Sequence, residues 1–163
     1  MPASFTLPDQ AQVITLLGPA ADAAGRTSAA AASLKHAHKA YLVFVLNQGN
    51  AATILLTPQQ ATAVAKTGAK AIPAVPIWAN QDEAATSLLT RQADAVNFTT
   101  DAAVKQKRVI FEVDPSKLDV AGGFDCLLAI TGASNVANIT CAELWVVPAR
   151  FQGTGGLQNL LVD

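Results

Sequence analysis

The segment from Ala40 to Ala65 carries no charged side chain, and this run constrains the fold more than any other feature of the chain. A membrane-spanning helix needs about 20 consecutive, mostly apolar residues. Here the polar sequence NQGN at 47–50 and PQQ at 58–60 interrupt the run, so it does not predict a membrane helix. The apolar blocks 41–46 and 52–57 are rich in β-branched and aromatic residues and predict two buried strands. NQGN predicts a hairpin or a sharp corner between them, with its glycine at a positive φ.

Alternation of apolar and polar residues predicts three further strands. In 107–114, Val109, Phe111 and Val113 fall on one face, and the following DPSKLD sequence predicts a helical turn capped by Asp114. The second strand covers 124–130, and the third covers 139–147. In the strand 124–130, the residues expected to face inward are Phe124, Cys126, Leu128 and Ile130. In the strand 139–147, they are Ala142, Leu144 and Val146, so Trp145 of this strand is expected to face outward.

Weaker patterns complete the strand set. Residues 12–17, 95–99 and 28–34 predict strands, although the alanine-rich stretch 20–32 also permits a helix. The proline-containing segment 66–80 predicts a long loop with a short edge strand. Short strands separated by turns, without a long amphipathic helix, predict an all-β antiparallel sandwich. A jelly roll is the commonest arrangement of eight such strands.

No second domain is indicated. Residues 1–163 therefore predict one β-sandwich domain with short helical turns, an extended N-terminal arm at 1–11 and a C-terminal tail at 149–163.

Charge excludes some partners. The chain has 11 Lys and Arg against 12 Asp and Glu, and only 14% of its residues are charged. This balance gives no basic patch for nucleic acid or an anionic membrane. The N-terminus has no basic segment before Arg26, so we expect no secretory signal and a cytoplasmic chain.

No motif predicts an enzyme, a cofactor or a metal site. His36 and His38 would share a face in a strand, but two ligands do not make a metal site. No serine lies in a G-x-S-x-G sequence, and the paired glycines match neither nucleotide-binding fingerprint. Cys126 and Cys141 are expected to be thiols, although neighbouring strands would also permit one disulfide.

The ends of the chain and its two tryptophans are the candidate interaction sites. Both ends carry apolar residues in sequences that are too broken by Pro, Gly and Gln to fold alone, so they either pack on their own sandwich or dock on a partner or a neighbouring copy. The candidate interface residues are Phe5, Leu7, Trp78, Trp145, Phe151, Leu157, Leu160 and Leu161.

Several segments together resemble the head decoration, or cement, proteins of tailed bacteriophages and prophages. They are SLKHAHKAYLVFVLNQGNAATILL, TPQQATAVAKTGAKAI, PIWANQD, RQADAVNFTTDAAVKQKRVIFEVDP and LDVAGGFDCLLAITGASNVANIT, which span most of 33–140. The alanine-rich stretch 28–33 and the tail after Pro148 depart from the pattern.

The resemblance implies a β-sandwich or jelly-roll protein without catalytic residues. Such a protein binds the outside of an expanded head and stabilises it. The implied partners are the major capsid protein and neighbouring copies in a dimer or trimer, with no direct nucleic acid or membrane contact. The implied location is the capsid exterior, after the host cytoplasm during assembly. The alternative is a sandwich that recognises glycans or a host surface through Trp78 and Trp145.

Overall fold

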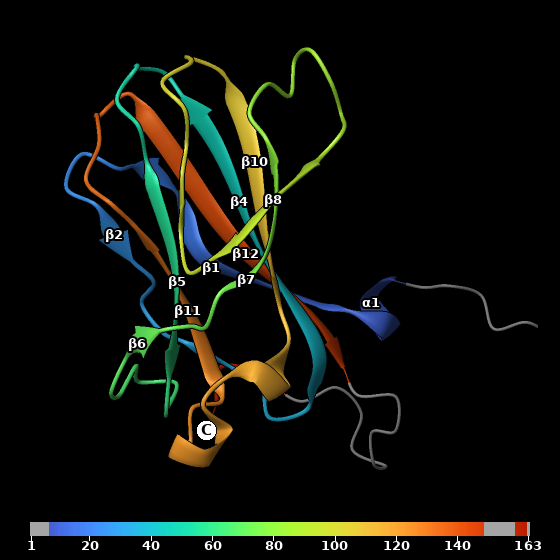
Figure 1. Ribbon diagram of the computed structural model, residues 1–163. Coiled ribbons are helices and arrows are strands. Elements are labelled where there is room, and N and C mark those ends of the chain that lie inside the picture. Colours follow the sequence, from blue (N-terminus) through green and yellow to red (C-terminus); the bar gives the residue numbers. More distant parts are fainter. Residues whose placement is uncertain (1–6, 149–158, 163) are drawn as a thin grey trace, which may run out of the picture.

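The computed structural model describes residues 7–148 and 159–162, and it confirms the all-β prediction (Figure 1). Within these described ranges, twelve strands form two antiparallel sheets. Sheet A has the order β1 (Gln12–Ala21), β12 (Asn138–Pro148), β4 (Ala37–Gln48), β10 (Gln106–Val113), β7 (Val75–Asn80) and β8 (Thr90–Ala95). Sheet B has the order β2 (Arg26–Thr27), β11 (Cys126–Thr131), β5 (Leu55–Ala61) and β6 (Lys70–Ala71); β3 (Ala32–Ser33) also pairs with β11, and β9 (Phe98–Thr99) with β5.

Strand pairing is nested along the chain. The first strand, β1, pairs with the last, β12, and β2 and β3 pair with the next to last, β11. Further in, β4 pairs with β10, and β5 pairs with β6 and β9. The chain therefore folds back on itself as a long antiparallel ribbon whose pairs alternate between the two sheets.

The main hydrophobic core lies between the sheets and takes side chains from both. Leu42 and Phe44 of β4, with Phe111 of β10, enter it from sheet A, and Leu56 and Leu127 enter it from sheet B. The Phe44 and Phe111 rings meet edge to face, with centroids 5.8 Å apart. Because every second residue of β10 and β12 is buried, the predicted inward faces of these two strands are confirmed.

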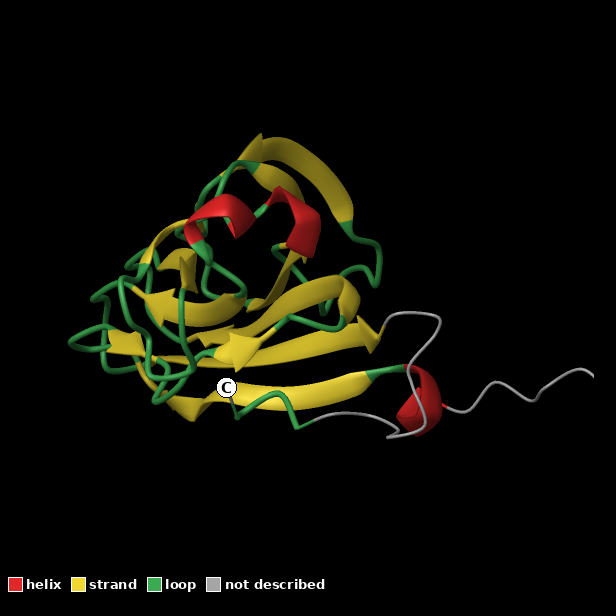
Figure 2. Ribbon diagram, turned by 90° about the horizontal axis from the view of Figure 1, so that it is seen from below, coloured by secondary structure: helices red, strands yellow, loops and turns green. Residues whose placement is uncertain are grey.

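Short helical segments follow local sequence signals. The 3₁₀ turn η1 (Pro115–Lys117) begins after Asp114, whose carboxylate accepts a hydrogen bond from the Ser116 amide at 3.0 Å, as predicted. A second turn, η2 (Val120–Gly122), follows it. The predicted extended arm is wrong over its described part, because residues 7–10 form the helical turn α1 (Leu7–Gln10), which projects from the start of β1 (Figures 1 and 2).

The NQGN sequence makes a corner between the sheets. It connects β4 of sheet A to β5 of sheet B, so the corner was the correct alternative and the hairpin was wrong. The second strand also begins three residues later than predicted, at Leu55. Gly49 does not have a positive φ; instead, a Cβ at this position would lie 2.5 Å from the carbonyl oxygen of Ala137. Glycine is required here because the Ala137 backbone lies too close for a side chain, and not because the residue has a positive φ.

The inward face predicted for β11 is wrong. Leu127 and Ala129 belong to the main core, whereas Cys126 and Leu128 lie in a second, smaller cluster on the other face of sheet B with Ala31 and Ala61. Because both faces of β11 are covered, its sequence lacks the alternation from which one buried face can be recognised.

The alanine-rich stretch and the proline-rich segment also differ from expectation. Residues 20–32 do not form a helix, and 28–34 supplies only the two-residue strand β3. Residues 95–99 are divided between the end of β8 and β9. In 66–80, β6 is a short edge strand as predicted, but β7 lies inside sheet A between β10 and β8. Pro76 is tolerated there because it lies at an irregularity in the pairing with β8, outside the residues that pair with β10.

Candidate interaction surfaces

The outer face of sheet A carries an apolar centre instead of the polar side chains usual on a solvated sheet. We call Tyr41, Val43 and Val45 of β4, Ile110 of β10 and Trp145 of β12 the outer patch. Tyr41 lies opposite Trp145, and Val43 lies opposite Ile110. With Arg108 and Glu143, these residues line a hollow of about 430 Å³. All five patch residues are half-buried in the single chain.

Charged groups surround the outer patch. Trp145 donates its indole N–H to Glu143 Oε2 at 3.3 Å, and Arg108 Nε lies 3.0 Å from Glu83 Oε1. Lys39 forms an ion pair with Glu112. The hydrogen bond from Lys39 holds the pKa of the Glu112 carboxyl below its usual value, and the same bond raises the pKa of Lys39. The patch is thus an apolar strip with fixed charges of both signs at its margins.

Trp78 extends this surface to β7. It lies opposite Ile110 and donates its indole N–H to Glu112 Oε2 at 3.4 Å. The Arg91 guanidinium lies over its ring, 5.8 Å from the centroid. The structure therefore places the two predicted tryptophans on one face of sheet A, and a contacting Arg91 covers part of the Trp78 ring.

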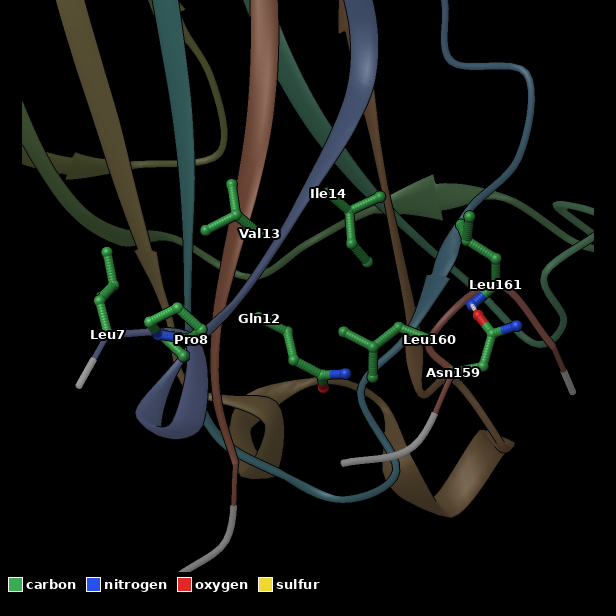
Figure 3. Close-up of a pocket in the computed structure, with 9 residues that line it drawn as sticks. Leu7, Pro8, Gln12, Val13, Ile14, Asn159, Leu160 and Leu161 are labelled. Carbon is green, nitrogen blue, oxygen red and sulfur yellow. Dashed lines mark hydrogen bonds between the residues drawn. The ribbon is translucent and has the colours of Figure 1, made fainter. Parts of the chain in front are cut away.

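The two ends of the described chain meet at a second hollow, of about 450 Å³, which we call the terminal hollow (Figure 3). Its lining consists of Leu7, Pro8, Ala11, Gln12, Val13, Ile14, Asn159, Leu160 and Leu161. Leu7 and Leu161 are 40% and 47% exposed. Leu160 is only 7% exposed and belongs to the main core, and its carbonyl accepts a hydrogen bond from the Ser33 amide at 2.7 Å.

Three of the eight predicted interface residues thus come together at the terminal hollow: Leu7, Leu160 and Leu161. The chain ends were expected either to pack on their own sandwich or to dock on a partner, and Leu160 packs on its own sandwich. Phe5, Phe151 and Leu157 lie outside the described residues.

A buried hydrogen-bond network around the charged side chain of Lys107 was not predicted from the sequence. Lys107 is fully buried, and its ammonium donates to Asp101 Oδ1 at 2.6 Å, to the Asp101 carbonyl at 2.8 Å and to Gln48 Oε1 at 3.0 Å. Thr100 also donates to Gln48 Oε1, at 2.8 Å. Lys107 lies on the same face of β10 as the buried residues Val109 and Phe111. The alternation along this strand therefore could have predicted its burial.

The described residues gather no metal-binding cluster. Within 7–148 and 159–162, no three His, Cys, Asp or Glu side chains form a cluster that could hold a metal ion. His36 lies in a turn before β4 and His38 inside that strand, and both are exposed. Cys126 and Cys141 lie in different sheets as separate thiols, and Cys126 Sγ lies 3.2 Å from Asp125 Oδ1. In the part of the chain that the structure describes, no helix has the length and apolar character needed to span a membrane.

Comparisons of the chain with protein-family models, curated proteins and solved structures found no match. Function is therefore inferred from the two surfaces themselves.

Proposed function

We propose that the chain is a structural virion protein that binds the outer surface of a tailed-phage capsid and stabilises the expanded head lattice. The observation that carries this proposal is the terminal hollow, where residues from both ends of the chain line one open apolar depression. Exposed apolar surface of this kind is typical of sites that dock on another protein. The resemblance of residues 33–140 to head decoration proteins supports the same class of partner.

We assign the sandwich to the jelly-roll arrangement. The nested pairing supports this assignment, because β1-β12-β4-β10 and β2-β11-β5-β6 are two sets of four antiparallel strands from one folded ribbon. In this assignment β7 and β8 extend the first set. Jelly rolls occur in viral capsid and lectin domains, so the fold is compatible with the proposal but does not by itself select a function.

A decoration protein binds a lattice of identical sites, which makes weak single contacts sufficient. Neighbouring bound copies that also contact one another raise the effective concentration of each copy at its site. The surface of this chain suits such binding, because its net charge is near zero and it carries more than one apolar region.

The test is the copy number of the chain in particles purified from its source, measured by quantitative mass spectrometry against the major capsid protein. We expect a fixed, simple lattice ratio. Absence from particles, or only a few copies in each, would overturn the decoration role.

The docking site is tested by co-sedimentation of the purified chain with expanded empty heads. Leu161→Asp places a charge in the terminal hollow and should weaken binding at least tenfold. Val120→Asp, at a 59% exposed position in η2, is the matched control and should bind as the unmodified chain does. Equal binding by both variants would exclude the terminal hollow as the capsid contact.

A second candidate function, glycan recognition, is favoured by one feature of the outer patch. Tyr41 and Trp145 are cross-strand neighbours, and Arg108 and Glu143 line the same hollow, so aromatic and charged groups are close together as in sugar-binding sites. Tryptophan fluorescence across a glycan panel tests this alternative. A saturable shift that Trp145→Ala abolishes would support it, and no shift with any glycan would count against it.

A further inference from the structure

The outer patch is unusually apolar for a sheet face that is not in the core. Antiparallel sheets that face water alternate apolar and polar residues, and their solvent face is the polar one. In β4 the outward positions at the centre are Tyr41, Val43 and Val45, which are all apolar or aromatic, and Ile110 and Trp145 flank them. The opposite face of β4 packs in the main core, so the outer patch lies on the face of the strand that is turned away from that core.

The charges at the patch margins indicate what covers it. Arg108 lies on β10 opposite Val45, and Glu143 lies on β12 opposite Val43. The two charges therefore lie on opposite sides of β4, and they are offset along it by two residues, or about 7 Å. An extended arginine side chain can span this offset.

A two-fold axis parallel to β4 makes this pattern self-complementary. Such an axis places β10 of one copy over β12 of the other and brings Tyr41, Val43 and Val45 against their own counterparts. Each Arg108 then lies over β12 of the second copy, two residues along the strand from its Glu143. An axis across the strands at Val43 would instead place Glu143 against itself, and Arg108 against Glu112, which already pairs with Lys39. The charges thus favour one of the two face-to-face arrangements.

We propose that the chain forms a two-fold symmetric dimer through the outer face of sheet A, with Tyr41, Val43, Val45, Ile110 and Trp145 at its centre and reciprocal Arg108–Glu143 ion pairs at its margins. The dimer specifies one partner of the proposed function, a neighbouring copy, but it does not need the capsid.

The test is a charge exchange followed by light scattering and native mass spectrometry. The unmodified chain should have twice the monomer mass of 16.8 kDa. Arg108→Glu and Glu143→Arg should each weaken the dimer at least tenfold, because like charges then face each other. An equimolar mixture of the two variants should form a heterodimer, since each interface again pairs opposite charges.

Two controls separate the interface from general effects. Glu83→Gln removes the partner of Arg108 within the chain and should leave the dimer intact, as should Lys117→Glu, a charge reversal in the exposed turn η1. Circular dichroism of each variant checks the fold. A monomeric or trimeric unmodified chain, or a dimer that both single variants retain, would overturn the proposal.

The outcome is independent of the capsid experiment. A dimeric chain that is absent from particles would overturn the proposed function and leave this interface standing. A monomeric chain found at a lattice ratio would do the reverse. A glycan that binds Trp145 in the unmodified chain without altering its mass would also oppose the dimer, because the dimer covers that side chain.

Discussion

Lys107 shows at the scale of one residue how a charge is accommodated in the core of this protein. A buried ammonium is costly unless acceptors replace its water. Lys107 has acceptors on Gln48 and Asp101, which lie at the end of β4 and in the loop before β10. The network therefore connects the end of β4 to the start of β10 and the loop before it, which are distant from β4 in sequence. Its burial was missed because lysine is rarely buried, although its position in the alternation of β10 predicts it.

Lys107→Met tests this network. We expect the free energy of unfolding to fall by roughly 2 kcal/mol, because hydrogen bonds to a charged group are lost and Gln48 keeps fewer partners. Lys105→Met is the matched control: Lys105 forms a half-exposed ion pair with Asp82, and its loss should change stability by less than about 1 kcal/mol. Urea unfolding of both variants measures the difference. Equal losses would mean that the buried network contributes no more than a surface pair.

The pH dependence of stability gives a second residue-scale prediction. Burial alone would raise the pKa of the Asp101 carboxyl, but hydrogen bonds, above all that from Lys107, hold this pKa below its ordinary value of 3.8. The unfolded chain thus takes up the proton first as pH falls. The Asp101 contribution should be complete above about pH 5 and be lost as pH falls through the lower, folded-state pKa.

Unfolding free energies of the unmodified chain and Lys107→Met, measured between pH 2 and about pH 6, isolate this contribution. The other carboxyls with lowered pKa values, on Asp82, Glu112, Asp114 and Asp119, are common to both proteins and cancel in the difference. The variant should lose less stability on acidification. Parallel curves would contradict the prediction.

At the scale of elements, the sequence predicted those strands that are buried on one face only. β4, β10 and β12 each have one face in the main core. Alternation predicted the buried faces of β10 and β12, whereas β4 was predicted as a strand from its continuous apolar block. β11 is covered on both faces, so no alternation marked its orientation. The two-residue strands β2 and β3 are held by pairing with β11, which local sequence does not encode.

The candidate surfaces were predictable to the same limited extent. Trp145 was expected to face outward and does so, and the apolar ends were recognised as contact regions. Trp78 and Trp145 share one face of sheet A because of the order of the strands in that sheet. Leu7 and Leu161 line the same hollow because the fold brings the two ends of the described chain together. These relations join residues far apart in sequence, and no local pattern contains them.

Gly49→Ala tests the corner between β4 and β5. A methyl group at this position would contact the Ala137 carbonyl, so the two loops must separate, and we expect a loss of roughly 1–3 kcal/mol. Gly18→Ala is the control, because a Cβ there meets nothing within 4 Å. Thermal unfolding of both variants gives the comparison, and a Gly49→Ala protein as stable as the Gly18→Ala protein would show that the corner adjusts freely.

At the scale of the whole molecule, the C-terminal residues 159–162 contribute to the core between the two sheets. Leu160 reaches the main core from beyond the last strand, and the Ser33 amide fixes its backbone. Its neighbour Leu161 lines the terminal hollow with nearly half of its surface exposed. Leu160 thus stabilises the fold, and Leu161 is available for contact with a partner.

Leu160→Ala and Leu161→Ala separate these two roles. The first removes buried methyl groups and should cost about 2–4 kcal/mol, whereas the second should cost less than about 1 kcal/mol. Guanidinium unfolding measures both changes. Similar costs would show that the C-terminal segment does not divide its roles in this way.

The place of β12 in sheet A has a consequence for biosynthesis. Because β12 lies between β1 and β4, these strands have no common neighbour until β12 has left the ribosome. A nascent chain therefore exposes the unpaired edges of two long strands during most of its synthesis, a state prone to aggregation. A chain that stops before residue 138 cannot close the sheet at all. Truncated products should thus be insoluble or degraded, and the synthesis of β12 becomes the step that commits sheet A to folding.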